Sequence, residues 1–193
     1  MFAHIKHWHL LSSKSVDMPY PRAIVIMAQN LLELTANNPD LHENKFYMLW
    51  NSILGHHFPI DMDYGIALQT SITGTGSKPE FLVVKIVRLR ESVVLVVGLK
   101  KPAQDTSGGR DKVKKELVEY IEERFDETDF PVIYAIAGIG LSWATYKMER
   151  TGSQELKALT EWSSNVTSAW DYTSLAGIAS VVHEMTREGE HLV

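Results

Sequence analysis

Two short apolar runs, at residues 81–87 and 93–99, constrain the fold of this chain more than any other part of its sequence. Both runs are rich in Val, Ile and Leu, have the length of a β-strand and are separated by the polar stretch 88–92. Nearly continuous apolar runs of this length are typical of strands that are buried on both faces of a sheet. The sequence therefore predicts a buried β-hairpin at the centre of the molecule.

Charged residues stand where this predicted hairpin starts and where it ends. Glu80, preceded by Pro79, opens the first strand, and Lys100 closes the second. A carboxylate and an ammonium group held by a rigid ribbon suit a metal-assisted site for phosphoryl chemistry. They suit equally well the solvated ends of an ordinary core hairpin, so this stretch alone leaves both interpretations open.

These residues resemble the core of the PD-(D/E)XK nuclease superfamily, and in particular nuclease-like domains that are common in fungal proteins. In that family an acid follows a Pro at the start of one strand, and the next strand ends in acid-x-Lys. Glu80 matches the first element and Lys100 ends the second, with Gly98 where the family has Glu or Asp. The resemblance covers residues 40–148 and implies a restriction-endonuclease-like fold, in which the acids bind Mg²⁺ and the lysine positions or activates the attacking water.

The resemblance also implies a set of metal ligands and catalytic residues. Glu80 would provide a carboxylate and the carbonyl of Leu99 a further oxygen for Mg²⁺ or Mn²⁺, while Lys100 would orient water or neutralise charge. Glu43, in the first turn of a helix predicted at 42–56, resembles the acid that reaches the metal from the preceding helix in the family. An acid in the first turn of a helix also favours the helix dipole, which is the alternative role for Glu43.

Gly98 removes the second acid of the motif, and the following helix holds a candidate replacement. Strand alternation places Val94, Gly98 and Lys100 on one face, so that an acid at position 98 would stand beside the lysine. Glu116 and Tyr120 resemble a Gln-x-x-x-Tyr signature found in part of the superfamily, with Glu in place of Gln. Glu116 would then supply the missing carboxylate; the alternative is a solvated glutamate on a helix.

The charge of the chain is distributed unevenly. The whole sequence has a formal net charge of −5, but residues 78–115 contain ten Lys and Arg against four Asp and Glu. A basic band on an acidic protein is a candidate surface for the phosphates of nucleic acid, with DNA favoured over RNA. The alternative is that these charges keep an apolar hairpin in solution. The residues that we expect to contact nucleic acid are Lys101, Arg110, Lys112, Lys114 and Lys115.

The remaining segments predict one domain of mixed α/β class, with its core at 40–148 and helical extensions at 1–39 and 149–193. We expect a mixed central sheet of about five strands with helices on its faces. The strands are predicted at 64–72, 80–88, 92–100, 131–139 and 141–148, and the helices at 42–56, 111–125, 155–162 and 173–187, with another between Pro21 and Asn37.

The composition excludes several classes of protein and site. The chain has no Cys, so disulfides, thiolate metal sites and Cys nucleophiles are excluded, and an intracellular, reducing location is expected. It has no run of about 18 apolar residues, so we expect no membrane partner. It also lacks a G-x-S-x-G elbow, an H-E-x-x-H motif and a glycine-rich nucleotide fingerprint.

Two hypotheses for the function remain. The first is a Mg²⁺-dependent endonuclease whose activity is weak because of Gly98, unless Glu116 has replaced the missing acid. The second is a non-catalytic nuclease-like module that binds nucleic acid or a protein partner, with a homodimer as one such arrangement. The position of the Glu116 carboxylate relative to Glu80 and Lys100 distinguishes these hypotheses.

Overall fold

A computed structural model describes residues 19–68, 79–87, 90–151 and 155–191 of the 193-residue chain. The described residues form one six-stranded sheet, in which the order of the strands in space is their order in the sequence. Every pair of neighbouring strands is antiparallel except β3 and β4, which are parallel. The strands are β1 (Tyr64–Leu68), β2 (Phe81–Val87), β3 (Arg90–Lys100), β4 (Val132–Ile139), β5 (Ser142–Glu149) and β6 (Lys157–Ala158).

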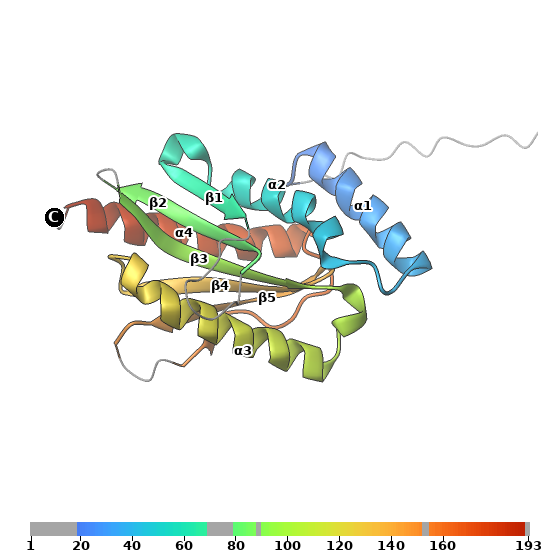
Figure 1. The fold of residues 1–193 in the computed structure, drawn as a ribbon. Helices are drawn as coiled ribbons and strands as arrows, with labels where there is room; N and C mark the ends of the chain where they lie inside the picture. The colour runs from blue at the N-terminus through green and yellow to red at the C-terminus, as the bar shows by residue number, and fades with distance from the viewer. Residues whose placement is uncertain (1–18, 69–78, 88–89, 152–154, 192–193) are drawn as a thin grey trace, which may run out of the picture.

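Helices cover both faces of the sheet (Figure 1). Helices α1, α2 and α4 pack on one face, and α3, which connects the two parallel strands, packs on the other. None of the described helices is both long and apolar enough to cross a membrane. The helices are α1 (Arg22–Asn37), α2 (Tyr47–His57), α3 (Ser107–Arg124) and α4 (Ala169–His191), with 3-10 turns η1 (Glu43–Phe46), η2 (Ile60–Met62), η3 (Pro102–Gln104) and η4 (Phe125–Glu127).

The sheet separates two apolar cores. On the side of α1, α2 and α4, the core contains Trp50 and Trp143, which are almost completely buried. On the side of α3, it contains Val113 and Leu117 of the helix packed against the strands. Burial of each large apolar side chain contributes about 1.5–3 kcal/mol to stability. Because both faces of β2 and β3 are covered, these two strands read as nearly continuous apolar runs in the sequence.

Two helices begin earlier than the periodicity of the sequence predicted, and a polar side chain caps each of them. Thr106 accepts a hydrogen bond from the backbone N–H of Gly109 at 3.1 Å, so α3 begins at Ser107 rather than at the predicted residue 111. Ser168 accepts from the backbone N–H of Asp171 at 3.1 Å, and α4 begins at Ala169 rather than at 173. N-terminal capping satisfies backbone donors that the helix itself leaves free, which explains both extensions.

The predicted mixed α/β class is confirmed, with six strands in place of about five. The continuation of the first strand to residue 72 lies outside the described residues, as does residue 88 of the second. The helix predicted at 155–162 is wrong, because Lys157–Ala158 form β6 at the edge of the sheet. This segment is held as a strand because the backbone N–H of Leu159 donates to the carbonyl of Thr145 at 2.8 Å.

The predicted alternation along β3 is wrong at Val94. Val83 pairs with Leu95 and Val84 pairs with Val93, so Val94 is the extra residue of a β-bulge. Val94 consequently faces the core of α1, α2 and α4, whereas the alternation placed it on the side of Gly98. Downstream of the bulge the expected alternation holds, and Gly98 faces α3.

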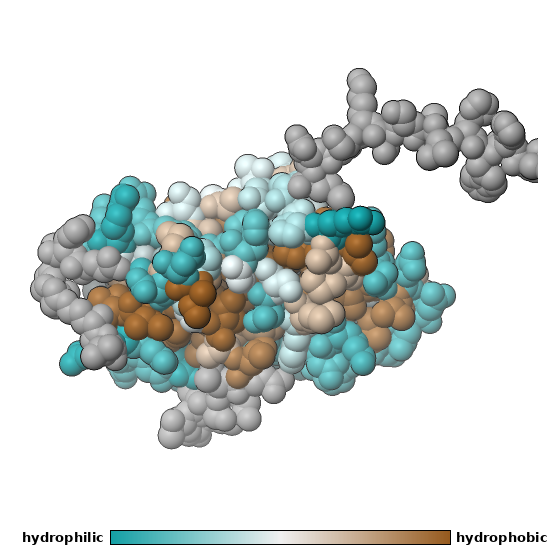
Figure 2. All heavy atoms as spheres, turned by 90° about the horizontal axis from the view of Figure 1, so that it is seen from above, coloured by the Kyte–Doolittle hydropathy of each residue, from teal (hydrophilic) through white to brown (hydrophobic). Residues whose placement is uncertain are grey.

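Seen from above, the surface over α1, α2 and β1 is a mixture of hydrophilic and apolar groups (Figure 2). Five exposed apolar side chains belong to these elements: Ile26, Leu32, Leu34, Met48 and Leu68. Apolar atoms form more than half of the surface of an ordinary folded protein. These side chains by themselves therefore indicate no binding site.

Candidate functional site

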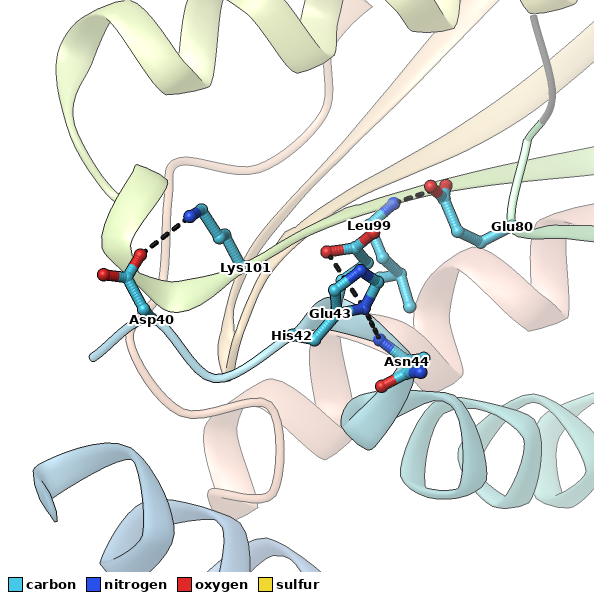
Figure 3. A network of polar contacts seen from close by, with 7 residues as sticks. All are labelled: Asp40, His42, Glu43, Asn44, Glu80, Leu99 and Lys101. Atoms are coloured by element: carbon cyan, nitrogen blue, oxygen red, sulfur yellow. Dashed lines mark hydrogen bonds and ion pairs between the residues drawn. The ribbon is translucent and has the colours of Figure 1, made fainter. Parts of the chain in front are cut away.

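The candidate site lies where β2 begins and β3 ends. The backbone N–H of Glu80 donates to the carbonyl of Val97 at 3.0 Å, which places Glu80 beside the last residues of β3. Its side-chain Oε2 accepts from the backbone N–H of Leu99 at 2.7 Å (Figure 3). Glu80 is 8% exposed, so this hydrogen bond holds a nearly buried carboxyl group against the end of β3.

Burial raises the pKa of Glu80 to about 7. The backbone N–H of Leu99 and the Lys100 ammonium oppose this rise in pKa, and the Glu116 carboxylate adds to it. Near neutral pH the carboxyl group therefore exists in both protonated and ionised forms. The charges of Lys100 and Glu116 act on Glu80 because all three side chains lie in the same neighbourhood.

Glu116 is directly bound to Lys100. Glu116 Oε2 lies 2.5 Å from Lys100 Nζ, and both side chains are partly exposed. Glu116 is on the third turn of α3, and Lys100 is the last residue of β3, so the ion pair joins the helix to the strand end. The predicted residues Glu80, Leu99, Lys100 and Glu116 are thus brought together at one edge of the sheet.

Gly98 faces the apolar side of α3. A Cβ atom at this position would lie 3.3 Å from Leu117 Cδ2 and 3.3 Å from Val113 Cγ2. The glycine therefore allows the strand and the helix to approach closely. A carboxylate at position 98 would leave the backbone toward these apolar side chains, where an ionised group loses much of its hydration.

Glu43 lies on the other side of the strand end, close to Lys101. Its Oε2 is 3.5 Å from His42 Nδ1, which also accepts a hydrogen bond from the backbone N–H of Asn44 at 3.3 Å. Lys101 Nζ is bound to Asp40 Oδ1 at 2.7 Å. This hydrogen bond raises the pKa of Lys101, and the nearby charge of Glu43 raises it further. Figure 3 shows these residues with Glu80 and Leu99.

Arg110, predicted to contact nucleic acid, is half-buried and is bound to other parts of the protein. Its Nε and Nη2 atoms lie 2.8 Å and 2.7 Å from Asp105 Oδ1. The other oxygen of Asp105 accepts from the hydroxyl of Ser142 at 2.7 Å. The guanidinium carbon of Arg110 is also 4.8 Å from the ring centroid of Trp162. Arg110 therefore has a structural role that joins α3 to β5 and to the segment before α4.

The other predicted cations of α3 differ in their surroundings. Lys114 Nζ lies 3.6 Å from Asp111 Oδ1 and 6.0 Å from the ring centroid of Tyr146. Lys112 and Lys115 are exposed on the solvent side of the helix. The band of basic residues in the sequence is consequently not one uniform basic surface, because Lys101, Arg110 and Lys114 each have a carboxylate partner.

The described part of the chain contains no group of three or more His, Asp or Glu side chains arranged to hold a metal ion. Glu43, Glu80 and Glu116 therefore do not form a three-carboxylate site. Sequence reasoning also missed Asp40, which neutralises Lys101. The two residues are 61 positions apart, and no periodicity or motif connects them.

Comparison with known proteins finds similarity to solved structures but not to known sequences. No family model matches the sequence, and no curated protein matches it. Among solved structures, the chain is similar to one described as a cryo-EM structure of a DrdV–DNA complex. The TM-score is 0.47 and the sequence identity is 13%, with 84% of this chain and 96% of the other chain covered.

Proposed function

We propose that this protein is a nuclease-fold enzyme that hydrolyses phosphodiester bonds, in DNA rather than RNA, through a site with a relocated carboxylate. The observation that carries the proposal is the contact of Glu116 with Lys100 beside Glu80. It gives the end of β3 two carboxyl groups and one ammonium group, the side-chain types expected of the PD-(D/E)XK motif. The order α2-β1-β2-β3-α3-β4-β5 agrees with the order predicted from the sequence and supports the same family.

Glu80, Glu116 and the carbonyl of Leu99 are the groups that would hold Mg²⁺ or Mn²⁺. Mg²⁺ prefers oxygen ligands and usually takes one or two protein carboxylates together with substrate phosphates, so this small set fits it. The burial of Glu80 supports the fit, because a carboxylate in a poorly hydrated position is stabilised by a nearby cation. Glu43, which lies beside His42 on the other side of the strand end, is outside this set. The ion would supply Lewis acidity toward the phosphoryl oxygen.

The side chains of the protein itself would divide the remaining tasks. Lys100 would neutralise negative charge on the phosphate, because its ammonium group is partly exposed at the end of β3. Glu80 would accept a proton from the attacking water, since a general base is most effective when its pKa is near the working pH. The Leu99 N–H would keep the Glu80 carboxyl group in place. We expect slow cleavage, because substrate phosphate must compete with Glu116 for Lys100.

A second function, binding without catalysis, is favoured by two other observations. Gly98 supplies no carboxylate and lies against the apolar side chains of α3. Within the described residues, no cluster of three acids or imidazoles offers a complete metal cage. A nuclease-like module with these properties would bind nucleic acid or a protein and leave phosphodiester bonds intact.

Plasmid nicking distinguishes the two functions. The full chain would be incubated with supercoiled DNA in Mg²⁺, in Mn²⁺ and in EDTA, in parallel with Glu116→Gln and Lys100→Ala. Glu119→Gln is the matched control, because Glu119 is an exposed residue of α3 outside the Glu80–Lys100–Glu116 neighbourhood. We expect the parent and Glu119→Gln to nick DNA in Mg²⁺ or Mn²⁺ and not in EDTA.

The two site variants should lose the metal-dependent activity. A parent that is inactive with either metal, yet binds DNA, would overturn the catalytic proposal and favour the binding module. Activity that survives both Glu116→Gln and Lys100→Ala would show that the cleavage arises elsewhere.

A further inference from the structure

His42 presents a hydrogen-bond donor to solvent beside the candidate site. Its Nδ1 accepts from the backbone N–H of Asn44, so the proton of the neutral ring is on Nε2. The side chain is 65% exposed. Among the described residues, none accepts a hydrogen bond from Nε2. The geometry therefore fixes both the tautomer of the ring and a free, outward donor.

The position of this donor relative to the lysines follows from three contacts. Asp40 binds Lys101, which holds the segment before η1 against the end of β3. His42 follows Asp40 by two residues, and its Nδ1 lies 3.5 Å from Glu43 Oε2. The charge of Glu43 raises the pKa of Lys101, which shows that the two side chains are near each other. Figure 3 shows His42 with Asp40, Glu43 and Lys101 around the end of β3. A phosphate group at Lys101 would therefore come within reach of the imidazole.

We propose that His42 binds a backbone phosphate of the nucleic acid through its Nε2–H and so positions the strand at the site. This inference rests on the proposed function, and it adds a positioning residue to it. The Nε2–H donates, and a phosphate oxygen accepts. Such contacts set the register of a nucleic acid on a protein, whereas the lysines contribute charge without direction.

Equilibrium binding in EDTA tests the role of His42 without requiring cleavage. The fluorescence anisotropy of a labelled DNA duplex would be measured with the full chain and with three variants. His42→Phe keeps a ring and removes the donor, and His42→Gln keeps an N–H donor. His56→Phe is the control, because His56 is an exposed histidine at the other end of α2, away from the site.

We expect His42→Phe to weaken binding about tenfold, as the loss of a hydrogen bond to a charged group does. His42→Gln should retain most of the affinity, and His56→Phe should bind like the parent. The slope of log K against log salt should not change in His42→Phe, because a neutral donor displaces no counterion from DNA. A lysine contact, by contrast, would change that slope.

Three results would overturn the inference. If the parent binds DNA and His42→Phe binds equally well, His42 has no role, and the proposed function is untouched. If His42→Gln is as weak as His42→Phe while its melting temperature equals that of the parent, the donor is not what matters. If the parent binds no DNA at any salt concentration, both this inference and the proposed function fail.

Discussion

Glu80 and His57 are two buried ionisable groups of the same molecule, and their surroundings differ. Glu80 lies at the edge of the sheet, where the charges of Lys100 and Glu116 act on it. His57 lies under α1 and α4, where its Nε2 is 3.1 Å from the hydroxyl of Tyr20. Burial is the main cause of both pKa shifts: it raises the pKa of Glu80 to about 7 and lowers that of His57 to about 4.

The difference separates a candidate site from a structural polar cluster. The carboxyl group of Glu80 has two charged neighbours with partly exposed side chains, Lys100 and Glu116, and under the proposed function a substrate phosphate would exchange with their ion pair. His57 is packed between aromatic rings, and its carbonyl contacts the Nε2 of His183 at 2.9 Å. A perturbed pKa marks a functional group only where such exchangeable charges accompany it.

The largest effect that follows from this comparison is the loss of cleavage in Glu80→Gln. Gln has nearly the same shape and still accepts from the Leu99 N–H, but it cannot take up a proton or carry a negative charge. We expect nicking to fall by two orders of magnitude or more. The free energy of unfolding at pH 4.5, where the Glu80 carboxyl group of the folded protein is protonated, should change by less than about 1 kcal/mol when measured with urea. A variant that is unstable instead would make Glu80 a structural residue, like His57.

The free energy of unfolding should depend on pH in opposite ways through Glu80 and through His57. Glu80 has a raised pKa in the folded state, so its contribution is full below pH 4.5 and is lost as the pH rises through about 7. His57 has a lowered pKa, so its contribution is full above pH 6.5 and is lost as the pH falls through about 4.

Each contribution should be on the order of 3 kcal/mol. Urea unfolding between pH 3 and 9 measures both. Glu80→Gln should remove the loss of stability between about pH 4.5 and 7, and the rise due to His57 between about pH 4 and 6.5 should then appear without opposition. A variant that keeps the loss of stability over that range would contradict the assignment.

His57→Ala should lower stability and leave cleavage unchanged. The substitution leaves a cavity and removes the partner of the Tyr20 hydroxyl, which together cost about 2 kcal/mol or more. Thermal unfolding checks the stability, and plasmid nicking at a temperature where the variant is folded checks the activity. His56→Ala, at an exposed neighbour, should change stability by less than about 0.5 kcal/mol. Loss of cleavage in folded His57→Ala would remove the distinction between the two regions.

The smallest predicted effects are those of substitutions at the lysines that we expect to contact DNA. Lys112→Ala and Lys115→Ala, at exposed lysines of α3, should each weaken binding severalfold and reduce the salt slope by about one per lost phosphate contact. Arg110→Ala should leave the salt slope unchanged, because Asp105 and Trp162 already hold that side chain. Anisotropy titrations at several salt concentrations measure these slopes. An Arg110 variant with a reduced slope would place Arg110 on the DNA-binding surface after all.

The sequence was informative wherever structure depends on local pattern. The apolar runs at 81–87 and 93–99 gave the central hairpin, because strands covered on both faces need apolar residues at every position. The sequence pointed to Glu116 as a candidate carboxylate through its resemblance to the Gln-x-x-x-Tyr signature. No geometric argument from the sequence predicted its contact with Lys100. The bulge at Val94 shifts the pairing of β2 with β3, and no residue type near Val94 marks it in the sequence. The segment β6 is a strand because it pairs with the free edge of β5, which the local sequence does not reveal.

The contacts of the basic residues were beyond the reach of the sequence. Arg110 and Lys101 read as free cations, and the fold brings Asp105 and Asp40 to them. The burial of Glu80 likewise depends on elements far apart in the chain. Charge counted along a sequence therefore overstates the charge that remains available on a surface.

The glycine at position 98 couples two positions that lie far apart in the sequence. It allows α3 to lie close enough to β3 for Glu116 to reach Lys100. Because a larger side chain at 98 would press on Val113 and Leu117, placing Glu there would push the helix and the Glu116 carboxylate away. Substitutions at positions 98 and 116 should therefore have non-additive effects, since each changes the setting in which the other acts.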